Sequence, residues 1–216
     1  KWCDAKDFVD TEKVKYDKFS VDWQLAVDVQ KIDKVIIKAD DDGDGVFEEV
    51  EECRLVLWDF HDLCFAIFHY YAGTSGQDVI TLSFNGWSQF VDDCGLASSE
   101  AKFTKKADFD RMFIGIDAKA RLGWKPAYEG DALPKKSLLR SGFLAALVQV
   151  AISKYVMTKE IADVSEALYA LLQDDIQPAL DPNVFCESNT FRTKYCYPQE
   201  VDFVLRSFEP SLRLLF

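Results

Sequence analysis

Apolar residues recur at helical spacing along most of the chain. The clearest stretches flank an acidic run, with Val27, Ile32, Val35, Ile36 and Ala39 before it and Val50, Cys53, Leu55, Val56 and Leu57 after it. Residues three and four positions apart share one face of a helix, so both stretches predict amphipathic helices. We expect a helix over 21–39, and two helices end to end over 48–71. The pattern predicts an all-α fold.

The acidic run between these helices, residues 40–51, reads DDDGDGVFEEVE. Counting Asp40 as the first position places a carboxylate at positions one, three, five, nine and twelve and a glycine at position six. Ca²⁺ takes about six to eight oxygen ligands, which alternate carboxylates on a sharply turning loop can supply. The candidate ligands are Asp40, Asp42, Asp44, the Val46 carbonyl, Glu48 and Glu51. The alternative is a solvated acidic linker, which the flanking helices disfavour.

This loop resembles the calcium loop of the EF-hand superfamily, including calmodulin-like proteins. The resemblance implies Ca²⁺ as the cofactor, with Glu48 acting through a water molecule and Glu51 giving two oxygens. It also implies that Phe47, at the eighth position, points into the core and pairs with a neighbouring loop.

Two further segments resemble the end of such a loop and its exit helix. Residues 80–90 place Leu82 at the eighth position and Gly86 at the twelfth, and residues 138–151 place Leu138 and Gly142 there. The resemblance implies that these loops lack the bidentate ligand and bind no calcium. Paired hands would brace each other through short strands at the eighth positions.

Glycine and serine residues interrupt the helical pattern at 94–99, which predicts a boundary there. We expect an N-terminal arm and one EF-hand pair in 1–97 and a degenerate helical lobe in 98–216. The expected fold is therefore two-lobed and EF-hand-like, with one intact calcium loop. A helix over 161–173 with a cap at Asp163 or Thr158, and a last helix over 198–215, complete the second lobe. In that last helix we expect the apolar side to face inward, namely Val201, Val204, Leu205, Phe208, Leu212 and Leu215.

One helical stripe in the second lobe is a candidate binding surface for a partner helix. Its residues lie three or four positions apart on one side of a helix: Leu144, Leu147, Val148, Ala151 and Tyr155. If the lobe's own helices leave them uncovered, they form a groove. The alternative is that they are internal core, and the sequence leaves both open.

Composition narrows the class of protein. A net charge of −12 argues against nucleic acid as a partner, and no apolar run is long enough to span a bilayer. The six cysteines would permit three disulfides, but their scattered positions favour free thiols and a reducing compartment. The two histidines, His61 and His69, lack a thiol partner at zinc-ligand spacing.

These sequence features favour one of three functions. We expect a calcium-binding structural or regulatory subunit of a larger assembly, and the alternative is a calcium-independent helical scaffold holding one dedicated partner. Two methionines against seventeen phenylalanines favour a dedicated partner over a promiscuous sensor. The absence of nucleophile, phosphate-loop and metalloprotease motifs predicts that the chain is not an enzyme.

We expect a cytoplasmic location, and a weaker similarity to EF-hand-type domains of axonemal and flagellar proteins implies a cilium or flagellum.

Overall fold

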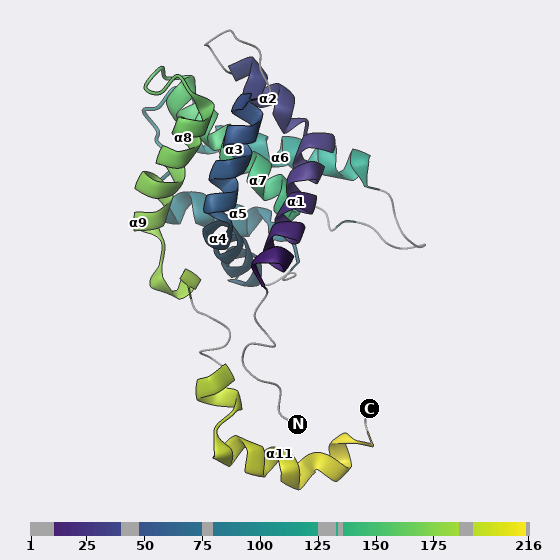
Figure 1. The fold of residues 1–216 in the computed structure, drawn as a ribbon. Helices are drawn as coiled ribbons and strands as arrows, with labels where there is room; N and C mark the ends of the chain where they lie inside the picture. The colour runs from purple at the N-terminus through teal and green to yellow at the C-terminus, as the bar shows by residue number, and fades with distance from the viewer. Residues whose placement is uncertain are drawn as a thin grey trace.

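The protein folds into a helical body with one further helix lying apart from it (Figure 1). The computed structural model describes residues 11–39, 48–74, 80–124, 133, 136–185 and 192–214, without the side chains of 192 and 193. Strands in these residues are limited to one two-stranded sheet, so the predicted all-α class is confirmed. None of the described helices is both long and apolar enough to cross a membrane.

The segment predicted as one helix before the acidic run is two helices, α1 (Glu12–Asp28) and α2 (Ile32–Ala39). Thr11 caps α1 by accepting a hydrogen bond from a first-turn N–H at 3.4 Å. Lys31 separates the two helices because its φ of 56° is left-handed and cannot continue a right-handed helix. The prediction of a single helix over 21–39 is therefore wrong, although its end next to the acidic run is confirmed.

The second predicted helical stretch is confirmed as two helices end to end. These are α3 (Glu48–Asp59) and α4 (His61–Thr74). Strand β1 (Leu82–Ser83) then leads into α5 (Phe84–Asp93). Gly95 ends α5 with a left-handed φ of 58°, which glycine adopts without steric cost.

Helix α7 forms the centre of the body. It follows α6 (Lys106–Gly123) and strand β2 (Ser137–Leu138), spans Arg140–Ala151 and continues as the π-helical turn η2 (Ile152–Val156). Ten of its twelve residues are buried, since α1, α6 and α8 all pack around it. A helix that is apolar on every side is expected in such a central position.

The remaining helices form a continuous run followed by a separate helix. The run comprises α8 (Val164–Ala170), the π-helical η3 (Leu171–Ile176) and α9 (Gln177–Ala179), followed by the 3₁₀ turn η4 (Pro182–Phe185). The π-helical turn η5 (Arg192–Cys196) precedes α11 (Gln199–Leu212).

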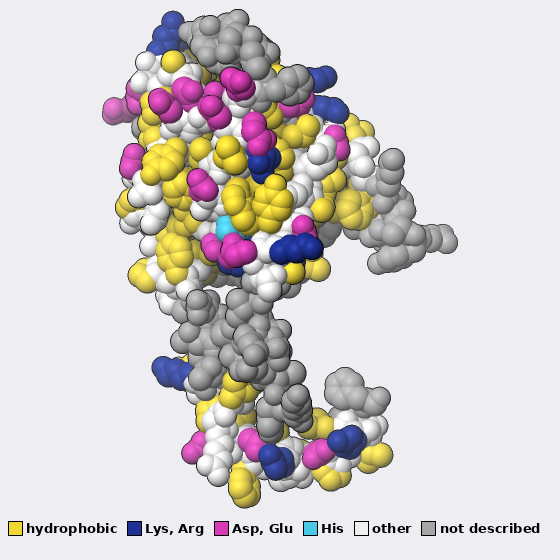
Figure 2. Space-filling view, viewed as in Figure 1, with side chains coloured by type: hydrophobic (Ala, Val, Ile, Leu, Met, Phe, Trp, Pro, Cys, Tyr) yellow, Lys and Arg dark blue, Asp and Glu magenta, His cyan; other side chains and the backbone are white. Residues whose placement is uncertain are grey.

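Helix α11 does not face the core with its apolar side. None of its described residues is buried, and Val204, Leu205 and Phe208 are each more than half exposed. The helix lies away from the body, and apolar side chains show on its surface (Figures 1 and 2). The prediction that Val204, Leu205, Phe208 and Leu212 point inward is therefore wrong, since the described residues leave all four exposed. Leu215 lies outside the described residues.

The sheet joins the two predicted units. Leu82 pairs with Leu138 and Ser83 with Ser137 in an antiparallel ladder, which crosses the boundary predicted at 97/98. The pairs α1 with α7 and α3 with α8 cross it as well. The units 1–97 and 98–216 thus share one hydrophobic core, and the two-lobed arrangement stays a prediction.

Candidate metal centre

The predicted calcium ligands divide into two groups in the structure. Asp40, Asp42, Asp44 and Val46 lie outside the described residues, as does Phe47. Glu48 and Glu51 lie in the first turn of α3, and both are exposed. Acidic side chains also favour this end of a helix, because its free N–H groups carry a partial positive charge. Figure 2 shows acidic side chains gathered over the upper part of the body, where α3 begins.

Glu51 has a defined partner on its own helix. Arg54 donates to its two carboxylate oxygens at 2.7 and 2.5 Å. These hydrogen bonds lower the pKa of the Glu51 carboxyl, and partial burial opposes them. The carboxylate is therefore ionised at neutral pH, as a calcium ligand has to be.

A second acidic group, which the sequence analysis missed, lies beside this turn. Carboxylate oxygens of Glu49, Glu52 and Asp163 lie within 4.8 Å of one another, the one such group found among the residues the structure describes. The signal visible in the sequence was the capping potential of Asp163. Its proximity to α3 depends on the packing of α3 against α8, which no local pattern reveals.

The hydrogen bonds of this group explain it without a metal. Asp163 is the N-cap of α8 and accepts from the Glu166 N–H at 2.7 Å, which confirms the predicted cap. Buried Glu49 accepts from the Ser165 N–H at 2.7 Å. The Ser165 hydroxyl donates to Asp163 at 2.8 Å, and its oxygen lies 3.4 Å from a Glu52 carboxylate oxygen. Carboxylates at a helix N-terminus satisfy its free N–H groups, so this group holds α8 on α3.

The two segments predicted to be degenerate loops have glycine at the position expected for the bidentate ligand. Both glycines are buried. A Cβ atom at Gly142 would lie 3.0 Å from Cγ2 of Ile116 on α6, so this position serves close helix packing. Gly86 is buried, and its N–H donates to the Ser83 hydroxyl at 3.1 Å at the start of α5. Both positions therefore lie inside the body rather than at its surface.

The candidate partner surface on α7 is part of the core. Leu144, Leu147, Val148 and Ala151 are each at most 1% exposed, and Tyr155 is partly buried. The Tyr155 hydroxyl donates to Asp175 at 2.6 Å. Of the two alternatives, the internal core is therefore the one the structure supports, because the chain's own helices α1, α6 and α8 cover this stripe.

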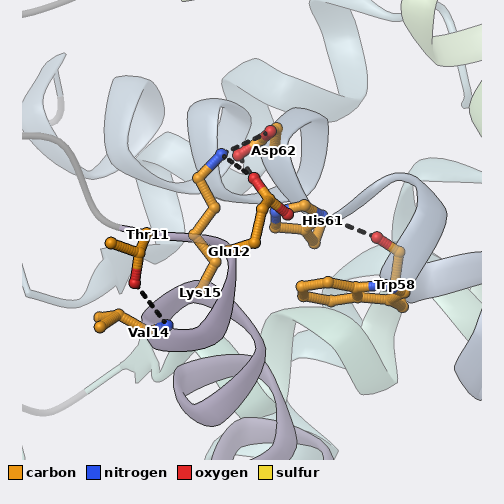
Figure 3. Close-up of polar contacts among 7 residues, drawn as sticks. All are labelled: Thr11, Glu12, Val14, Lys15, Trp58, His61 and Asp62. Carbon is orange, nitrogen blue, oxygen red and sulfur yellow. Dashed lines mark hydrogen bonds and ion pairs between the residues drawn. The ribbon is translucent and has the colours of Figure 1, made fainter.

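His61 takes part in a polar network that fixes the corner between α3 and α4 (Figure 3). Its Nδ1 lies 2.7 Å from the Trp58 carbonyl oxygen, and its ring stacks on the Trp58 ring at 4.2 Å. Asp62 lies beside it and accepts from Lys15 of α1 at 3.0 Å. Buried His61 therefore holds the corner between α3 and α4, and its neighbour Asp62 ties the start of α1 to that corner.

Comparisons with known proteins assign the chain to no family. No protein-family model, curated protein or solved structure matches the chain.

Proposed function

We propose that the chain binds one Ca²⁺ in the loop 40–51 and acts as a structural or regulatory subunit of a larger assembly. The observation that carries this proposal is that a helix lies on each side of the loop. Helix α2 ends at Ala39, and α3 begins at Glu48. The carboxylate spacing thus occurs between two helices, as a calcium-binding helix–loop–helix requires. Asp40, Asp42, Asp44, the Val46 carbonyl, Glu48 and Glu51 would hold the ion.

The sheet supports an EF-hand-like arrangement for the rest of the body. Leu82 and Leu138, the residues assigned to the eighth position of two degenerate loops, pair with each other. Each strand lies between two helices, α4 and α5 in one unit and α6 and α7 in the other. Under this proposal the two degenerate hands form a calcium-free pair that supports the single working loop.

The metal would act here by binding alone. Ca²⁺ would draw the carboxylates of the loop together and neutralise part of their charge, which the chain's excess of acidic residues otherwise leaves unbalanced. The movement of the Glu48 and Glu51 carboxylates toward the ion would also shift α3, since both residues belong to its first turn. Helix α3 packs on α2, α4 and α8, so a change in its position would reach the C-terminal half.

A thermal melt tests calcium binding to the folded chain. A ligand that binds only the folded state raises the melting temperature. We expect calcium to raise the Tm of the wild type relative to a chelator, and to raise that of Glu51→Gln much less. An equal shift in both proteins would contradict the proposed ligand set.

The alternative function, a calcium-independent scaffold, is favoured by α11. Its apolar residues Phe203, Phe208 and Leu212 are exposed among the described residues, and a dedicated partner would bury them. A pull-down from native material with and without chelator separates the two functions. Chelator-sensitive capture supports the regulatory subunit, whereas capture that resists chelator supports the scaffold. A place in a cilium or flagellum stays a proposal that the same capture would test.

A further inference from the structure

Arg54 lies one helical turn after Glu51 and holds both oxygens of its carboxylate. The Arg54 Nε donates to Oε2 at 2.7 Å and Nη2 donates to Oε1 at 2.5 Å. This bidentate geometry is the strongest form of an arginine–carboxylate pair. The same two oxygens are those that the twelfth position of the loop would offer to Ca²⁺.

The guanidinium of Arg54 also contacts the neighbouring helix α1. The Arg54 side chain is 18% exposed, against 55% for Glu51. Its Nη1 donates to the Tyr16 hydroxyl of α1 at 3.4 Å, and the Tyr16 ring meets the Trp58 ring edge-on at 4.9 Å. Side chains on a helix lean toward its N-terminus, so Arg54 is directed at the first turn of α3. An arginine ordered in this way loses little further freedom when it binds a carboxylate.

We propose that Arg54 is an internal competitor of the metal that sets the calcium affinity of the loop. Glu51 cannot give both oxygens to Ca²⁺ while Arg54 holds them, so the ion pair opens whenever the metal binds. Calcium binding then frees the guanidinium, with Tyr16 as its remaining described hydrogen-bond partner. This inference rests on the proposed function.

The test compares the calcium dissociation constants of wild type, Arg54→Gln and Arg111→Gln in the 216-residue chain by calorimetry. Arg111 is a matched control because it pairs with Asp108, also three residues away, at 2.8 Å on α6. Both variants remove one positive charge and one ion pair of the same spacing. We expect Arg54→Gln to tighten Kd by about two- to fivefold, the range for ion pairs of this kind. Arg111→Gln should leave Kd unchanged.

A second variant separates geometry from charge. Arg54→Lys keeps the positive charge but cannot make two parallel hydrogen bonds, so its Kd should fall between those of wild type and Arg54→Gln. A Kd for Arg54→Gln equal to that for Arg111→Gln would overturn the inference without contradicting the proposed calcium site. A wild-type chain that binds no calcium would overturn the proposed function together with the inference, so the two failures are distinguishable.

Discussion

Leu82 and Leu138 lie opposite each other in an antiparallel pair, and both are fully buried. Their pairing brings the unit α4–β1–α5 against the unit α6–β2–α7, with Ser83 and Ser137 as the neighbouring pair. The sequence placed both leucines at the same position of two related patterns. Two segments that were assigned the same pattern thus meet at corresponding residues. The EF-hand pair was expected within 1–97, whereas this ladder joins a segment of 1–97 to a segment of 98–216.

The close contact of α6 and α7 gives the first prediction. Gly142→Ala places a Cβ 3.0 Å from Ile116, whereas a Cβ at Gly115 on the exposed side of α6 meets nothing within 4 Å. Overpacking costs about 1–3 kcal/mol, and the gain in helix propensity returns about 1 kcal/mol. Gly142→Ala should therefore lose up to about 2 kcal/mol in urea denaturation. Gly115→Ala should gain about 0.5–1 kcal/mol. Equal gains in both would contradict the packing account.

The second prediction contrasts α7 with α11. Leu147 is fully buried, so Leu147→Ala should lower the free energy of unfolding by about 2–5 kcal/mol. Phe208 is 58% exposed, so Phe208→Ala should change it by less than about 0.5 kcal/mol. Chemical denaturation of both variants measures the difference. A large loss for Phe208→Ala would show that α11 packs on the body in solution.

Apolar spacing and capping residues predicted the helices around the acidic run. Features that depend on contacts between distant segments were not predictable from local sequence. Apolar periodicity placed α3 and α4, and the side-chain chemistry of Asp163 marked the cap of α8. The break at Lys31 was not predictable, since lysine carries no residue-type signal for a left-handed conformation.

The candidate sites likewise combine features that local sequence predicts with features that depend on long-range contacts. Periodicity identified the apolar side of α7 but not the helices that cover it, so Leu147 fitted both a groove and a core. The contact between Glu49 and the Ser165 N–H joins residues 116 positions apart and depends on the packing of α3 against α8. A pattern within either helix alone contains no information about that contact.

The third prediction concerns pH. Burial raises the pKa of Asp22, and the Arg140 guanidinium, with Nε 2.9 Å from Oδ2, only partly opposes this. The folded state therefore holds this proton more tightly than the unfolded chain does. The contribution of Asp22 to stability is greatest below its ordinary pKa of 3.8 and falls as pH rises through the raised pKa.

Urea denaturation of wild type and Asp22→Asn over about pH 4 to 7 measures this contribution. We expect the difference between the two free energies of unfolding to move in favour of Asp22→Asn as pH rises. Asp17→Asn, on the exposed side of α1, controls for the loss of one charge. A difference that stays constant over this range would contradict the prediction.

The fourth prediction concerns thiol reactivity. Cys53, Cys64 and Cys94 are free and buried, whereas Cys196 is free and exposed. Burial raises the pKa of Cys53, and it raises those of Cys64 and Cys94 to about 12. At pH 8 iodoacetamide should therefore modify Cys196 in the native chain and the other three only after unfolding, because the thiolate is the reactive form. Peptide mass spectrometry identifies each site, and native labelling of Cys64 at the rate of Cys196 would refute the prediction.

Calorimetric titration of Ca²⁺ into wild type, Glu51→Gln and Glu52→Gln tests the central claim most directly. Glu52 is the matched control, because it lies next to Glu51 but belongs to the carboxylate group with Glu49 and Asp163. We expect one equivalent of calcium in the wild type with a Kd of roughly 10⁻⁷ to 10⁻⁵ M, unchanged binding in Glu52→Gln and a large loss in Glu51→Gln. No binding, two equivalents, or a loss in Glu52→Gln with Glu51→Gln unaffected would contradict a single calcium site in the loop 40–51.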